Sequence, residues 1–126
     1  MQGWCATIAA PYLAENPAVQ PWIKRFTDKY GLGPSSYAFT AYDAMLVALD
    51  AIKRVADSGL PMTRSSVRDA IQTAHVETLQ GIVSFDQYGD IKDRTISVFQ
   101  AQENAQYPVA DVLHQYKYLG TAPESV

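Results

Sequence analysis

The chain has 126 residues and is poor in the side chains that bind metals, with one cysteine and two histidines. A single cysteine, Cys5, excludes an internal disulfide and a cysteine-based metal cluster. His75 and His114 lie in different segments, without a cysteine or carboxylate at ligand spacing. We therefore expect no metal site and no cofactor, and we expect Cys5 to be a small buried apolar residue.

Long apolar runs are also absent. No stretch approaches the about 20 apolar residues that span a bilayer. Met1 is not followed by a basic and then an apolar segment, so we expect no signal peptide in this chain. The net charge is only -3 and the basic residues are scattered. Nucleic acid is therefore not an expected partner.

Catalytic motifs are missing as well. The sequence contains no G-x-S-x-G elbow, no G-x-G-x-x-G and no P-loop, and Ser65 and Ser66 fit the start of a helix. Asp86, Asp90 and Asp93 do not have the spacing of a calcium-binding loop, and a hairpin turn accounts for the segment FDQYGD. The interpretation is that the chain has no catalytic residues and is not an enzyme.

Apolar residues make up 48% of the chain, enough for a packed core. Their spacing predicts helices over residues 18–30, 37–57 and 64–74. In the longest helix, we expect an apolar stripe on one face and charged residues on the opposite face. The stripe consists of Tyr42, Met45, Leu49, Ile52 and Ala56, and the opposite face carries Asp43, Asp50, Arg54 and Asp57.

The apolar pattern alternates instead over residues 3–10, 82–85 and 95–100, which predicts strands. The last two are expected to form a hairpin around a turn at residues 86–90. Residues 109–118 are expected to form a short final element. The fold class is therefore α/β, but three amphipathic helices need more sheet than these few strands supply. We infer that the chain does not complete its own core.

Two aromatic residues mark a candidate binding site. Tyr37 and Phe39 follow a Gly-Pro loop at the start of the longest helix. A helix N-terminus offers free N–H groups, and an aromatic side chain there can form one wall of a small-molecule cleft. The alternative is that both residues pack in the core.

The order of these motifs resembles a known family. Residues 16–57 read NPAVQPWIKRFTDKYGLGPSSYAFTAYDAMLVALDAIKRVAD, a helix ending in an aromatic-Gly pair, a Pro-containing loop, then Tyr-Asp-Ala within a long helix. A short helix and the segment GIVSFDQYGD follow. In this order they are similar to the late part of type I periplasmic solute-binding proteins, the Leu/Ile/Val-binding family of ABC transporter substrate-binding components.

This resemblance implies a periplasmic binding protein type I fold, with two α/β lobes that close on a ligand like a hinge. It implies amino acids or related small molecules as ligands, an ABC permease as partner and a periplasmic location for the full-length parent. Tyr37 matches an aromatic or apolar residue that lines the side-chain pocket. Tyr12 falls near a crossing between lobes and borders the cleft in this interpretation.

The chain corresponds to less than half of such a protein, its C-terminal part. By the resemblance, residues 1–11 are a lobe-crossing strand, residues 12–102 are the helical and hairpin part of one lobe, and residues 103–126 are a crossing segment and tail. The groups that grip the ligand's charges lie mainly in the missing part, so we expect little or no binding by this chain alone. The alternative function is a small-molecule sensing domain in a regulatory or receptor protein.

The shortage of strands also predicts an assembly. The helices over residues 18–30 and 37–57 each carry an apolar stripe. Left in water, the two stripes would form a larger apolar surface than a soluble monomer normally exposes. A second copy covers them at low cost if identical segments are exchanged. We therefore expect a domain-swapped homodimer, with residues 3–10 and the region after Gln100 as the exchanged segments.

Overall fold

The computed structural model describes residues 3–108 and 112–123. The chain divides into two compact units, each described separately. The first, here called the strand unit, consists of residues 1–36 and 94–126. The second, the helix–hairpin unit, consists of residues 37–93. The units divide after residues 36 and 93, whereas the expected segments divide after residues 11 and 102. The assignment of these segments to lobes stays a prediction.

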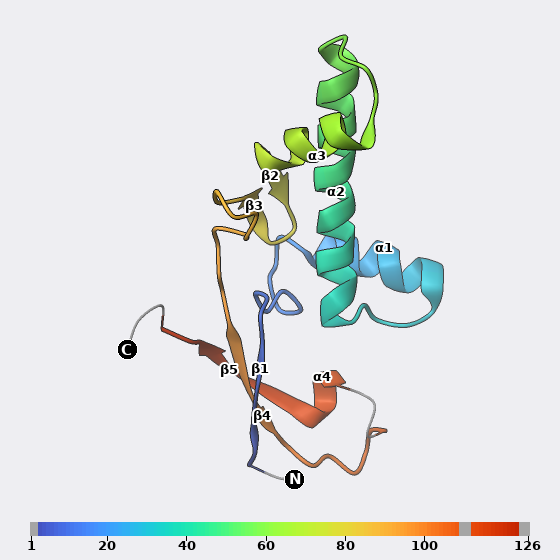
Figure 1. The fold of residues 1–126 in the computed structure, drawn as a ribbon. Helices are drawn as coiled ribbons and strands as arrows, with labels where there is room; N and C mark the ends of the chain where they lie inside the picture. Colours follow the sequence, from blue (N-terminus) through green and yellow to red (C-terminus); the bar gives the residue numbers. More distant parts are fainter. Residues whose placement is uncertain (1–2, 109–111, 124–126) are drawn as a thin grey trace. The chain divides into compact units, whose positions relative to one another are not determined.

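The strand unit contains a three-stranded antiparallel sheet with the order β1-β4-β5 (Figure 1). Its strands are β1 (Cys5–Ile8), β4 (Ser97–Ala101) and β5 (Tyr116–Thr121). The register pairs Cys5 with Gln100 and Ile8 with Ser97. The expected strands over residues 3–10 and 95–100 are confirmed, but both are shorter. Residue 5 lies on an edge strand and is exposed, so the expectation of a buried Cys5 was wrong.

Helix α1 (Gln20–Tyr30) also belongs to the strand unit and begins two residues later than predicted. Pro21 lies in its first turn, where the missing N–H costs no helical hydrogen bond. The helix ends at Gly31, whose φ of 75° is left-handed and closes the last turn through a backbone bond to Thr27. Trp22 is buried and packs against Phe26 on the same helix.

The helix–hairpin unit contains α2 (Ser36–Asp57, from Tyr37 onward), α3 (Arg64–Gln72), β2 (His75–Thr78) and β3 (Gly81–Ser84). The two strands form an antiparallel hairpin that turns at residues 79–80. Val47, Ala74 and Val83 form the core of the unit, and Ile71, Val76, Phe85 and Ile91 pack around it. Thr63 and Ser66 form a reciprocal capping box at the start of α3.

The predicted pairing of residues 82–85 with 95–100 was wrong. β3 pairs with β2, which the sequence analysis missed, and β4 pairs with β1 and β5. The turn at residues 86–90 is present, and a bridge between Phe85 and Ile91 flanks it. The physical reason is that β4 pairs with a strand along each of its edges, while β3 has β2 as a neighbour across a turn of two residues.

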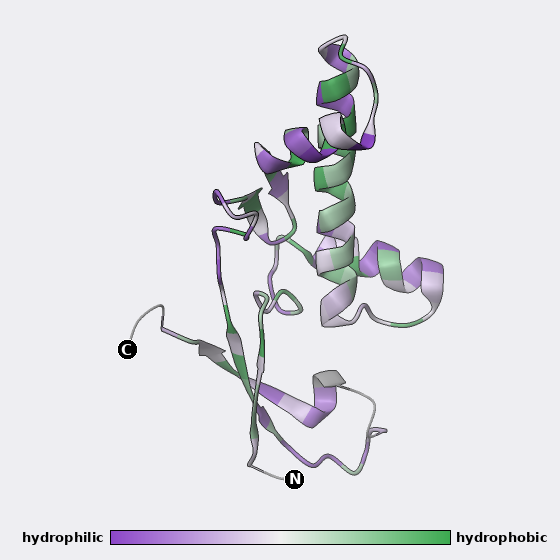
Figure 2. Cartoon of the chain, in the orientation of Figure 1, coloured by the Kyte–Doolittle hydropathy of each residue, from purple (hydrophilic) through white to green (hydrophobic). Residues whose placement is uncertain are grey.

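The predicted polar face of α2 was wrong for Asp43, which is buried. The buried residues are Phe39, Asp43, Val47, Ala51 and Val55. Met45, Leu49 and Ile52, which belong to the predicted apolar stripe, are 58%, 53% and 42% exposed. Figure 2 shows why the pattern misleads, because α2 is green or pale over most of its length whereas α3 is largely purple.

The expected element at residues 109–118 is a short helix, α4 (Val112–Gln115), followed directly by β5. Residues 109–111 of that expectation lie outside the described residues. Within the part of the chain that the structure describes, no helix is both long and apolar enough to cross a membrane.

Candidate functional site

Tyr37, the predicted ligand contact, lies in the first turn of α2 and is 77% exposed. Its carbonyl accepts a hydrogen bond from the Thr40 hydroxyl at 3.2 Å, one turn further on. Phe39 is buried instead. The interpretation that both aromatics pack in the core therefore holds for Phe39 and fails for Tyr37. The phenol of Tyr37 is accessible at the end of α2 that carries free N–H groups and the positive end of the helix dipole.

Asp43 is the buried polar residue of α2 and joins the helix to the hairpin. Its side chain is 1% exposed, and its two carboxylate oxygens accept the backbone N–H groups of Leu79 at 3.0 Å and Gln80 at 3.2 Å. These amides form the turn between β2 and β3, where strand pairing leaves them without a ladder partner. Asp43 thus fixes the hairpin against α2 through two charge-assisted hydrogen bonds.

The apolar pattern predicted Asp43 on the polar face of the helix and did not indicate this role. The signal was present, because Asp43 stands four residues from both Phe39 and Val47 and therefore shares their face. An aspartate inside an apolar stripe indicates a buried carboxylate that accepts specific N–H groups.

Arg54 makes the corresponding connection between α2 and α3. Its guanidinium donates to the carboxylate of Asp50 at 2.8 Å, to the carbonyl of Ala70, and to the hydroxyl of Thr73 at 3.2 Å. The last turn of α3 leaves carbonyl groups without helical partners, and a cation satisfies them favourably. Arg54 therefore positions the C-terminal end of α3 relative to α2.

Residues 86–90 form a self-contained turn. One oxygen of the Asp86 carboxylate accepts the backbone N–H groups of Tyr88 at 2.9 Å and Asp90 at 3.1 Å. Gly89 has a φ of 89°, which favours glycine. This geometry confirms the turn interpretation of FDQYGD. Among the described residues, no group of three metal-ligating side chains comes together.

Three aromatic rings cluster on the sheet of the strand unit. Tyr12 stacks on Tyr118 with ring centroids 4.6 Å apart and meets the edge of Phe99 at 5.5 Å. Burial raises the pKa of the Tyr12 phenol, and the charge and hydrogen bond of Glu15 raise it further. Tyr12 therefore serves the packing of this sheet, while its predicted position at the border of the cleft stays a prediction.

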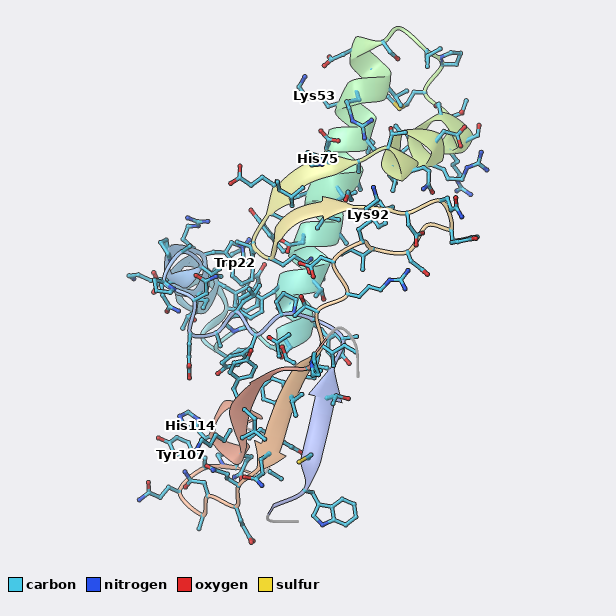
Figure 3. The ribbon with its side chains drawn as sticks, turned by 90° about the vertical axis from the view of Figure 1, so that its left-hand side faces the viewer. Trp22, Lys53, His75, Lys92, Tyr107 and His114 are labelled. Atoms are coloured by element: carbon cyan, nitrogen blue, oxygen red, sulfur yellow. The ribbon has the colours of Figure 1, made fainter. Side chains whose placement is uncertain are left out.

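Gln115 organises the loop that precedes α4. Its amide nitrogen donates to the carbonyls of Asn104 at 2.9 Å and Tyr107 at 3.0 Å, and its amide oxygen accepts the N–H of Asn104 at 3.1 Å. The rings of Tyr107 and His114 stack at 3.6 Å, and Figure 3 shows them side by side. No pattern in the sequence indicates this arrangement, because it depends on residues seven or more positions apart in a loop.

The comparison with protein families decides the identity. Residues 1–106 match the family described as periplasmic binding protein. The chain belongs to the periplasmic binding protein family. Members of this family are transport binding proteins and not enzymes. No curated protein sequence matches the chain.

Solved structures of this family share the fold. The leucine-binding protein of Thermotoga maritima is 23% identical and has a TM-score of 0.67, over 95% of this chain and 31% of its own length. A substrate-binding protein from Desulfitobacterium hafniense in complex with leucine is 18% identical, with a TM-score of 0.64, over 94% of this chain and 31% of its own. A solute-binding protein of R. palustris in complex with benzoate is 16% identical, with a TM-score of 0.67, over 95% of this chain and 30% of its own length.

The periplasmic binding protein type I fold expected from the sequence is therefore confirmed. The chain spans about a third of the length of the structures it matches. The relatives are ABC transporter substrate-binding proteins whose ligands include leucine and benzoate.

Proposed function

We propose that this chain is the C-terminal part of an ABC-transporter solute-binding protein that captures branched-chain amino acids or related small molecules. The family match over residues 1–106 is the observation that carries this proposal. The full-length parent would hand its ligand to an ABC permease from the periplasm. In this proposal the chain alone binds little, because an amino acid carries two charges that a binding site must pair. The first half of α2, beside Tyr37, has Asp43 as its charged residue, and that carboxylate is buried and already accepts two backbone N–H groups.

Tyr37 is the proposed ligand contact of this chain. Its exposure in the first turn of α2 leaves the ring available to pack against an apolar side chain, as a pocket wall does. An aromatic wall without a charged partner suits the apolar side chain of leucine or valine, or the ring of benzoate, better than the carboxylate of any of these ligands. The α2 N-terminus beside it is electrically suited to an anionic group.

The chain is also proposed to self-associate as a homodimer. β1 and β5 both pair with β4 within one copy. An exchange of either strand between two copies would therefore rebuild the same ladders. Residues 3–10 and the region after Gln100 stay the proposed exchanged segments.

A chimera tests the ligand proposal. Residues 3–108 of this chain would replace the corresponding part of the Thermotoga maritima leucine-binding protein, which supplies the rest of both lobes. Circular dichroism and light scattering first establish that the chimera folds as a monomer. We expect calorimetry to show binding of leucine, valine or an aromatic acid at micromolar concentration. A folded chimera that binds none of these, while the unmodified T. maritima protein binds leucine, would refute the proposal.

A further inference from the structure

No further inference is drawn: the strongest candidate, the exposed apolar face of α2 that carries Met45, Leu49 and Ile52, belongs to a chain that spans about a third of the structures it matches, and nothing in the described residues shows what covers it.

Discussion

Replacing Asp43 by asparagine removes the charge from the most deeply buried polar contact of the helix–hairpin unit while keeping its size. The carboxylate now accepts two backbone N–H groups, from Leu79 and Gln80. An asparagine offers one acceptor oxygen, and its NH₂ group meets the other N–H as a second donor. One of the two amides therefore loses its partner inside the protein.

The size of the effect follows from this count. A hydrogen bond to a charged group contributes about 1.5–3 kcal/mol, and an unsatisfied buried donor costs about 1–3 kcal/mol. The neutral amide is easier to bury than the carboxylate, which offsets part of the loss. We expect the free energy of unfolding to fall by about 2–4 kcal/mol, a large fraction of the stability of a small domain.

Urea unfolding followed by circular dichroism measures the change, at one fixed protein concentration because association adds to stability. Amide exchange should accelerate most at Leu79 and Gln80. Asp57→Asn is the control on the same helix, since that carboxylate pairs with Lys53 on the surface, where water screens the pair, and its loss should change stability little. If both variants unfold at the same urea concentration as the unmodified chain, the Asp43 contact contributes nothing and the reasoning fails.

Three further predictions concern the ligand and the sheet. Calorimetry of the chain alone should show leucine and valine binding no tighter than millimolar, and micromolar affinity would contradict the view that the charge-binding groups lie elsewhere. In the chimera, Tyr37→Ala should weaken binding by about 1–3 kcal/mol, measured beside Tyr88→Ala as an exposed control, and an unchanged affinity would remove Tyr37 from the pocket. Tyr12 has its pKa raised by burial, so the stability that its neutral phenol contributes is complete below the unfolded pKa near 10.0 and is lost as the pH rises through the folded value. Above pH about 10, the free energy of unfolding measured in urea should therefore fall less with pH for Tyr12→Phe than for the unmodified chain. An equal fall in the two proteins would contradict the prediction.

The helices were predictable because local chemistry sets their ends. Thr63 caps α3 through its side chain, and Gly31 ends α1 in a left-handed conformation. These signals act within a few residues and can be read without the rest of the fold. Because of the prolines near its start, α1 begins at Gln20, two residues after the predicted position.

Strand pairing and helix faces were harder to predict because they depend on distant residues. β2 has the sequence HVET, in which Val76 is the main apolar residue, so its strand character comes from its neighbour β3. α2 is apolar on two faces, and the sequence alone does not decide which of them packs inward. The predicted stripe contains the larger side chains, whereas Asp43 and the small Ala51 lie on the buried face, which the pattern did not indicate.

The candidate site was predictable only in part. The place of Tyr37 in the first turn of the longest helix was predicted from the Gly-Pro loop that precedes it, whereas its exposure was left open. Gln115, which holds its loop through four hydrogen bonds to Asn104, Tyr107 and Pro108, could not be found, because glutamine carries no distinctive pattern.

The pairing of β1 with β4 has a consequence for the order of folding. The register joins Cys5 to Gln100, so β1 has no partner in this sheet until β4 has been synthesised. Residues 37–93 form a contiguous unit that lies between the two strands in the chain. During synthesis, at about 5–20 residues per second, β1 therefore waits several seconds with an unpaired edge while the helix–hairpin unit is made. In that interval the exposed strand is open to pairing with another nascent copy, so a slow ribosome would favour exchanged strands over closed single chains.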